Sequence, residues 1–197
     1  MRNETGARWT MAVAVLVLRT LAASECAAAE RRIGAEANEA RGPRRVVVSI
    51  SDRKLAVVEN DKVIGRFDVA VGRPASPSPV GTFTIVNRIE RPTYYAPGKV
   101  IPPSTRNPLG TRWLGLSIKG FGIHGTDEPR SIGHARSHGC IRLRNSDIEV
   151  LFDLVRPGDI VELHLERTAE ICELFAAANR APVQIVAANL PPSQAAR

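Results

Sequence analysis

Aromatic residues are scarce in this sequence, at 5% of its 197 positions, so large rings cannot supply most of a core. The apolar material is mainly Val, Ile, Leu and Ala, in a composition that is 44% hydrophobic and 24% charged. This balance is typical of a globular protein with one packed domain and tails. Because many of the apolar residues are β-branched, the composition favours a sheet.

The apolar run near the start, residues 9–18, falls well short of the ~20 residues that cross a bilayer as a helix. Arg2 and Arg8 precede it, and small residues follow as far as Ala29, which is the layout of a secretory signal peptide. We therefore expect residues 1–29 to be a signal peptide. The mature protein is then exported to the periplasm or cell envelope, with no stable membrane span after cleavage. An uncleaved anchor is the alternative.

Acidic residues are outnumbered, with 20 Asp and Glu against 27 Lys and Arg, so the formal net charge is +7. Removing residues 1–29 takes away three basic and two acidic residues and leaves 24 minus 18, or +6. A basic exported domain suits a polyanionic neighbour, such as a cell-wall polymer or a membrane surface. Nucleic acid is not an expected partner, because the sequence has neither a basic helix nor an alternation of aromatic and basic residues. The sequence does not indicate an oligomeric state.

Cysteine is also rare, and only Cys140 and Cys172 lie beyond residue 29. In an oxidising compartment these two could form a structural disulfide around the 31 residues between them. Cys172, however, lies in TAEICELFAAA, where Ile171, Leu174 and Phe175 indicate a buried helix face. We interpret Cys172 as a packing residue.

Short β-branched runs predict the strands of one domain. Residues 30–44 are charged and Ala-rich without a sustained apolar period, as in a linker, and the domain should begin directly after them. Asn60-Asp61 separates two of the runs, so the first three predict a series of hairpins. The predicted strands are VVVSI (46–50), KLAVVE (54–59), VIGRFDVAVG (63–72), GTFTIVNRI (81–89), WLGLSI (113–118), FGIHG (121–125) and IVELHL (160–165), the last as a closing strand.

Two proline-rich stretches interrupt this pattern. Residues 73–79 predict a rigid surface loop, since proline cannot donate to a sheet ladder. Residues 91–110 hold five prolines, two glycines and both tyrosines. A long irregular insert inside a compact domain is typical of a binding loop or lid, and we expect this one to roof a site.

Residues 145–155 predict a short helix. Ser146 and Glu149 have capping-box spacing, and Ile148, Leu151 and Phe152 share one helical face. Another helix over 168–179 and a strand at 182–188 predict a C-terminal extension covering residues 166–197. The fold class we expect is therefore mostly β, a small sandwich or barrel-like sheet system with one short helix after residue 140 and a helical extension.

The stretch HARSHGCIRL, residues 134–143, concentrates reactive side chains around one glycine. A cysteine attacks as the thiolate, and with a reference pKa near ~8.5 it needs a base such as histidine at neutral pH. Gly139 permits a sharp turn, whose backbone N–H groups, including that of Cys140, could form an oxyanion hole. In GIHGT, His124 lies between glycines at a strand end, and the carbonyl of Gly125 could fix its tautomer.

A zinc site is the sharper alternative for the same residues. His134 and His138 have a helical ligand spacing, and Cys140 lies close in sequence. Gly133 and Gly139 argue against a helix there, and the sequence offers no second cysteine pair to complete a structural site. A buried, unreactive Cys140 is the remaining alternative.

Three segments together resemble the catalytic domain of the YkuD-type L,D-transpeptidases, over roughly residues 45–165. In that family a histidine in an HG[TS]-like segment is followed by [ST]HGC; here the two reactive residues are 16 positions apart. The resemblance implies a YkuD-like β-sandwich or barrel-like catalytic domain. The segments are VAVGRPASPSPVGTFTI, WLGLSIKGFGIHGT and SIGHARSHGCIRLRNSDIEVLFDLVRPGDIV.

The resemblance also implies roles for individual residues. Cys140 would be the nucleophile and His124 the proton donor and acceptor, with Gly139 in the oxyanion hole. The reaction implied is acyl transfer on peptidoglycan tetrapeptide stems through a Cys140 thioester, without a metal or other cofactor. Ser76 and Ser78 stand where threonines are common, and Arg142 where asparagine is frequent. The residues shaping the substrate pocket would be Ser137, His138, Arg142 and Gly125.

Two other functions fit the same residues. Water could resolve the thioester instead of an amine, which would make the chain a peptidoglycan hydrolase or carboxypeptidase. A wall-binding module with a silent site is the third alternative, which the presence of both Cys140 and His124 disfavours.

Overall fold

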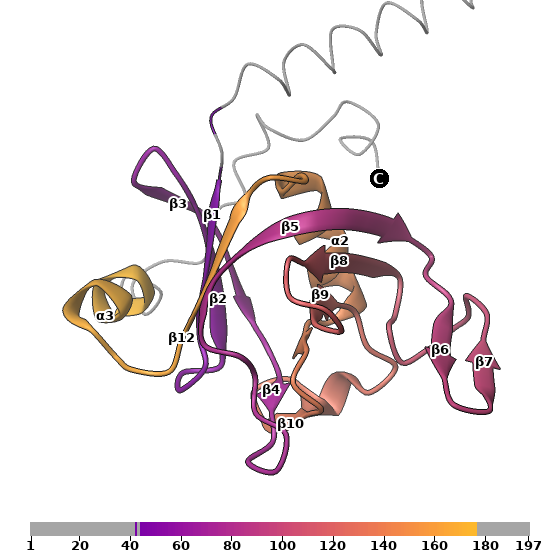
Figure 1. The fold of residues 1–197 in the computed structure, drawn as a ribbon. Coiled ribbons are helices and arrows are strands. Elements are labelled where there is room, and N and C mark those ends of the chain that lie inside the picture. The colour runs from indigo at the N-terminus through magenta and orange to yellow at the C-terminus, as the bar shows by residue number, and fades with distance from the viewer. Residues whose placement is uncertain (1–41, 43, 177–197) are drawn as a thin grey trace, which may run out of the picture. The chain divides into compact units, whose positions relative to one another are not determined.

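The computed structural model describes residue 42 and residues 44–176 of the chain. Their fold is mostly β, with an eight-stranded sheet curled into a half-barrel and two short helices (Figure 1). The strand order in this sheet is β11-β9-β8-β5-β12-β1-β2-β3. The fold class predicted from composition and periodicity is confirmed.

The hairpin series predicted at the start of the domain is confirmed. β1 (Arg45–Ser49), β2 (Lys54–Glu59) and β3 (Lys62–Asp68) pair antiparallel in sequence order. The third strand ends at Asp68 and does not continue to residue 72. Instead β4 (Val71–Gly72) pairs with β10 (Ala135–Ser137) as a separate parallel ribbon, which brings the proline-rich loop after Gly72 beside the HARSHGC stretch.

The later strands form as expected, although the last has a different position. β12 (Ile160–His164) was expected to close the sheet, but it lies in the middle, parallel to β1 and antiparallel to β5. The side chains of Val161 and Leu163 are buried from this central position. The remaining strands of the large sheet are β5 (Gly81–Glu90), β8 (Arg112–Leu116), β9 (Gly122–His124) and β11 (Ile141–Arg142).

Apolar side chains cover both faces of the β1–β2 region. Val46 and Val48 face the main core, which includes the helix α2 (Asn145–Leu154). Val47 faces the other way and packs with Ile171 and Phe175 of α3 (Ala169–Ala176). Figure 1 shows the two helices on different sides of these strands. Because side chains alternate along β1, one face of this strand packs against α2, on the side of the curled sheet where β8 and β9 lie, and the other face packs against α3.

The predicted helix after residue 140 is present, but the capping box is not. The N-cap is Arg144, which makes no side-chain capping bond, and Ser146 lies inside the first turn with its hydroxyl bound to Asp147. The helix begins at Asn145, two residues earlier than a cap at Ser146 requires. Ile148, Leu151 and Phe152 are buried as the periodicity predicts.

The 91–110 insert is more regular than its composition suggests. It contains a two-stranded hairpin, β6 (Tyr94–Ala96) and β7 (Lys99–Ile101), which Figure 1 shows projecting to one side of the sheet. Asn107 is fully buried at its base, where its amide donates to the carbonyl of Pro92 at 2.7 Å. A short 3₁₀ helix, Pro129–Ser131, follows β9.

Some predictions concern residues that lie outside those described. These are the signal peptide at 1–29, most of the 30–44 linker, and the strand at 182–188. Among residues 42 and 44–176, no helix is both long and apolar enough to cross a membrane.

Candidate active site

The two reactive segments are adjacent in the sheet. β9 and β11 pair in parallel, with Ile123 opposite Ile141 and His124 opposite Arg142. Cys140 directly precedes this ladder, so it lies two register positions from His124 on the neighbouring chain segment. Paired strands run ~4.8 Å apart with a rise of ~3.3 Å per residue, so both side chains belong to one small region of the half-barrel.

His124 is buried, with 4% of its surface exposed, and its ring is held on two sides. Its Nδ1 lies 2.5 Å from the carbonyl oxygen of Gly125, which can only accept, so Nδ1 carries the proton. That contact meets the expectation that a backbone carbonyl fixes the tautomer. The indole of Trp113 stacks on the imidazole with centroids 5.6 Å apart. Nε2 is therefore the nitrogen left to accept a proton.

Burial strongly disfavours the charged form of His124. Desolvation lowers the pKa of His124 to about 4; the positive charge of Arg142 acts in the same direction, and the Gly125 carbonyl opposes it. The imidazole is consequently neutral at physiological pH. A neutral ring with a free Nε2 lone pair can act as a base.

The thiol of Cys140 is also neutral at rest. Burial raises its pKa above the ordinary value, while a backbone hydrogen bond of Gly122 and the charge of Arg142 act to lower it. Its Sγ lies 3.7 Å from the carbonyl oxygen of Gly120. The site therefore holds a neutral thiol and imidazole, so proton transfer must accompany nucleophilic attack.

Arg142 faces the same region from β11. It is directly opposite His124, its side chain is 15% exposed, and it pairs with Glu128 at 3.3 Å. Its charge lowers the pKa of both His124 and Cys140. A fixed cation there stabilises negative charge on sulfur and keeps the imidazole unprotonated.

The turn before Cys140 is held from within by Ser137. This residue is fully buried; its hydroxyl accepts from the Gly139 N–H at 3.0 Å and donates to the Cys140 carbonyl at 2.5 Å. The Gly139 N–H thus donates within the turn, and its oxyanion-hole role stays a prediction; the Cys140 N–H is the other donor named for that role. Ser137 therefore shapes the turn from a buried position.

Gly139 needs to be glycine at this position. Its φ is +112°, and a Cβ there would lie 2.6 Å from the ring of Phe121 and 3.2 Å from the carbonyl oxygen of Pro77. The proline-rich loop makes a further contact, since Ser76 donates from its hydroxyl to the His138 carbonyl at 3.0 Å. The 73–79 loop therefore supports the nucleophile turn.

The structure does not assemble the zinc alternative. His134 and His138 are both exposed and flank the extended β10 rather than sharing a helix face. Within the described ranges, no three His, Cys, Asp or Glu side chains gather in a way that could hold a metal ion. Cys140 and Cys172 are both free thiols.

Two residues at the site were missed from the sequence. Trp113 was predicted only as part of the strand at 113–118, yet it faces His124, and its ring is within 2.6 Å of where a Cβ of Gly122 would be. Their pairing in register across β8 and β9 could be found only from the topology. Asn145 was seen only as the start of a helix, whereas its side chain reaches the segment after His124.

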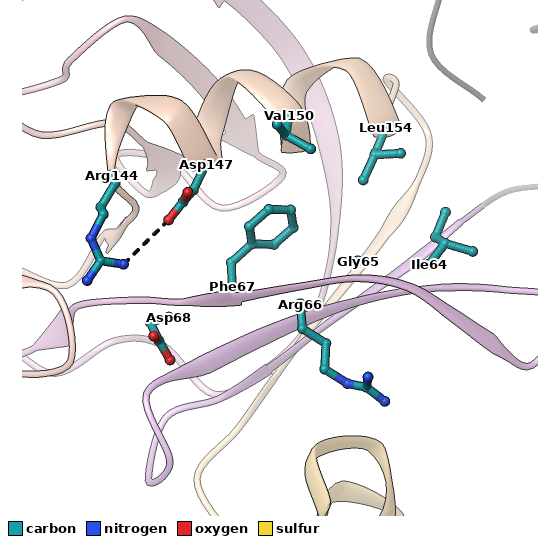
Figure 2. A pocket seen from close by; sticks show the side chains of 9 residues that line it. All are labelled: Ile64, Gly65, Arg66, Phe67, Asp68, Arg144, Asp147, Val150 and Leu154. Atoms are coloured by element: carbon teal, nitrogen blue, oxygen red, sulfur yellow. Dashed lines mark ion pairs between the residues drawn. The ribbon is translucent and has the colours of Figure 1, made fainter. Parts of the chain in front are cut away.

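A separate cavity lies between β3 and α2. It encloses about 280 Å³, and Figure 2 shows Phe67 and Leu154 pointing into it with the Arg144–Asp147 ion pair at one end. Neither Cys140 nor His124 lines it. We therefore place the reactive site elsewhere, at the β9–β11 pair.

Comparison with known proteins identifies the relationship. The model of the YkuD family, described as the L,D-transpeptidase catalytic domain, matches residues 43–163. The chain belongs to the YkuD family. It is an L,D-transpeptidase-family enzyme of the cysteine-dependent class.

Curated relatives from Bacillus match the same part of the chain. YkuD of Bacillus licheniformis is 38% identical over 121 residues, which are 61% of this chain and 66% of that protein. YqjB of Bacillus subtilis is 36% identical over 126 residues, covering 61% and 71%. Both carry L,D-transpeptidase names. The YkuD-family segment thus spans about two thirds of the length of these relatives.

Solved structures share the fold. An L,D-transpeptidase from Mycobacterium tuberculosis has a TM-score of 0.54 at 24% identity, covering 62% of this chain and 58% of the other. The C442S mutant of an Enterococcus faecium L,D-transpeptidase has a TM-score of 0.54 at 25% identity, covering 63% and 50%. The half-barrel is therefore the fold seen in L,D-transpeptidase structures.

Proposed function

We propose that the YkuD domain of this chain is a cysteine acyltransferase that acts on peptidoglycan tetrapeptide stems through a thioester on Cys140. The observation that carries the proposal is the parallel β9–β11 pair, which sets a buried imidazole of fixed tautomer beside the strand that directly follows Cys140. Family membership supports the substrate class.

The first step forms the acyl-enzyme. The Sγ of Cys140 attacks the carbonyl carbon of the third stem residue, and Nε2 of His124 takes the thiol proton. The C–N bond to the terminal D-alanine then breaks, and His124 passes the proton to the departing amine. Because the Cys140 thiol and the His124 imidazole are both neutral at rest, His124 does not have to lose a proton before it can accept the one from the thiol.

The second step releases the acyl group. An amine of another stem attacks the thioester carbonyl and gives its proton to His124. The C–S bond breaks, the new amide leaves, and the proton returns to the sulfur. Water in place of the amine would make the product a tripeptide, so exclusion of water on the acceptor side decides between transfer and hydrolysis.

The distribution of charge supports a wall substrate. Residues 69–145, which hold the site, contain eleven Lys and Arg but three Asp and Glu, whereas residues 45–68 and 146–176 together contain seven and twelve. Arg73, Lys119 and Arg136 are exposed, and none pairs with an acid in the described part of the chain. Stem peptides carry carboxylates, so this unpaired positive charge suits them.

Export belongs to the same proposal. The substrate class lies outside the cytoplasm, and the basic, apolar and small segments of residues 1–29 follow the order of a signal peptide. Cell fractionation with intact-mass measurement tests this: we expect an envelope protein lacking about the first 29 residues, and a cytoplasmic full-length chain would contradict export.

Product analysis tests the reaction itself. We would incubate the protein with tetrapeptide muropeptides, with Cys140→Ala as control, and follow the products by mass. Cross-linked dimers support transfer, and tripeptides alone mean hydrolysis. Products that also form with Cys140→Ala would overturn the thioester.

A further inference from the structure

A single amide side chain, that of Asn145, joins the two segments that hold the imidazole of His124. Asn145 is the first residue of α2, five positions after Cys140. Its Oδ1 lies 3.2 Å from the backbone nitrogen of Thr126 and 3.3 Å from that of Thr111. Both neighbours are N–H donors, so the amide must present its oxygen to them.

The first contact acts on the peptide group that orients the ring. The Gly125–Thr126 peptide presents its carbonyl oxygen to Nδ1 of His124 at 2.5 Å and its N–H to Asn145. A hydrogen bond accepted from the N–H of a peptide polarises its carbonyl and strengthens the bond on the other side. Asn145 therefore fixes the position of this carbonyl and increases its negative charge.

The second contact acts on the strand that carries the stacking indole. Thr111 directly precedes β8, whose Trp113 packs on the His124 ring. The same oxygen thus ties the start of β8 to the residue after β9. The ring is held between these two elements.

The local sequence makes room for this amide. A Cβ on Gly110 would lie 2.1 Å from Oδ1 of Asn145, and one on Gly125 would lie 2.2 Å from it. Both positions must therefore lack a side chain, as glycine does, for Oδ1 of Asn145 to reach the two backbone N–H groups. Gly110 also has a φ of +63°, which favours glycine independently.

We propose that Asn145 is a positioning residue for His124, holding the Gly125–Thr126 peptide and the start of β8 so that Nδ1 stays protonated and Nε2 is directed to the reacting thiol. The proposal rests on the acyl transfer proposed above only for its link to activity. The tautomer and the pKa of His124 can be measured without any substrate.

The charged and titratable groups around His124 determine what a substitution will change. From β11, Arg142 faces the ring together with its partner Glu128, and Cys140 lies just before that strand. From β8 the uncharged Trp113 faces it, and from α2 the uncharged Asn145 reaches its carbonyl partner. Asn145→Asp would keep the acceptor oxygen and add a negative charge, which favours imidazolium.

The experiment compares Asn145→Ala, Asn145→Asp and the control Ser146→Ala by ¹⁵N NMR of the His124 ring and by iodoacetamide alkylation of Cys140. Ser146 is exposed on the same helix turn, and its hydroxyl contacts only the Asp147 side chain within the described residues. The control thus reports any general effect of altering the start of α2.

We expect Asn145→Ala to mix the two His124 tautomers and slow alkylation at neutral pH by about tenfold. Asn145→Asp should keep the Nδ1–H tautomer and move the midpoint of the His124 titration upward from about 4. Ser146→Ala should match the wild type in both measurements.

Two results would overturn the proposal. One is an Asn145→Ala protein with the wild-type tautomer and alkylation rate. The other, decisive if Asn145→Ala does not fold, is an Asn145→Asp protein whose His124 titrates as in the wild type. Failure to cross-link muropeptides would instead contradict the proposed function and leave both ring measurements valid.

Discussion

The indole of Trp113 lies against the imidazole of His124, with ring planes 22° apart and centroids separated by 5.6 Å. The two residues are register partners on β8 and β9, so the sheet itself determines the contact. The stacked indole contributes to the burial of the imidazole, and this burial lowers the pKa of His124.

Replacing the indole should therefore make His124 a stronger base with a poorly held ring. Trp113→Ala would let water reach the imidazole, which removes desolvation and raises the pKa of His124 from about 4 toward its ordinary value. We expect a loss of stability of about 3 kcal/mol from the vacated volume. NMR titration and chemical denaturation measure the two effects. Trp113→Phe, which keeps a stacking ring, should fall between; an unchanged titration in Trp113→Ala would contradict this role.

Arg142 should increase the reactivity of the Cys140 thiol by lowering its pKa. Its charge lowers the pKa of Cys140 and of His124, so Arg142→Gln should raise both. At a fixed pH below the thiol pKa, less thiolate is then present, and we expect alkylation to slow by roughly three- to tenfold. The pH dependence of iodoacetamide alkylation measures this. Glu128→Gln is the matched control because it removes the partner and leaves the cation. A faster reaction in Arg142→Gln would be incompatible with the electrostatic role.

Stability should depend on pH through His124. Its folded pKa of about 4 is below its unfolded value of about 6.5, so the folded state binds fewer protons between these pH values. The free energy of unfolding is therefore at its full value above pH 6.5 and falls by about 3 kcal/mol as the pH drops to 4. Urea denaturation of wild type and His124→Gln at several pH values tests this. The difference between the two proteins should change across this window, and a constant difference would contradict it.

A comparison of two glycines with positive φ can test whether close packing around Gly139 matters for stability and activity. Gly139 has φ +112°, and a Cβ there would meet neighbouring atoms within 3.2 Å, whereas Gly133 has φ +85° and nothing within 4 Å of the corresponding position. Alanine at either position costs roughly 1 kcal/mol for the backbone alone. We expect Gly139→Ala to lose more stability than Gly133→Ala and to lose activity as the turn moves away from Phe121. Thermal denaturation and muropeptide turnover give the two readouts, and equal effects would exclude a steric role.

The unpaired cations near the site should contribute to wall binding. Arg73 donates from its backbone N–H to the Ser137 carbonyl, and Arg136 is exposed on β10, so both flank the nucleophile turn. Binding of the Cys140→Ala protein to isolated peptidoglycan should weaken with salt and with Arg73→Gln plus Arg136→Gln. The control pair is Arg53→Gln, in the turn before β2, plus Lys62→Gln, at the start of β3. Equal weakening by both pairs would contradict a role for this face.

The fold was largely predictable because its signals are local. The β-branched runs of β1 and β2 and the apolar face of α2 are patterns within single segments, and each matches the element observed. The central position of β12 was not predictable, since parallel pairing with β1 joins residues more than a hundred positions apart. Local periodicity does not determine strand order.

At the site, only the reactive side chains could be predicted from the sequence. Chemistry marks Cys140 and the histidines near it as reactive, because few other side chains in these segments can exchange a proton near neutral pH. The resemblance to the YkuD-type family then selects His124 from these histidines. The residues that hold them, Trp113 and Asn145, act through register and through a side chain that crosses between elements. Gly139 has the positive φ expected of a sharp turn, while the hydrogen bond from its N–H to Ser137 was not foreseen. A hydrogen bond of this kind becomes visible only in three dimensions.

The covalent intermediate is the most direct test of the central claim. Intact-mass spectrometry after rapid mixing with a tetrapeptide stem should show the wild-type protein gaining the mass of the stem less its terminal D-alanine, and peptide mapping should locate the acyl group on Cys140. His124→Ala should accumulate the same adduct much more slowly, and Cys140→Ala should not form it. An adduct on another residue, or one formed as fast without His124, would contradict the account.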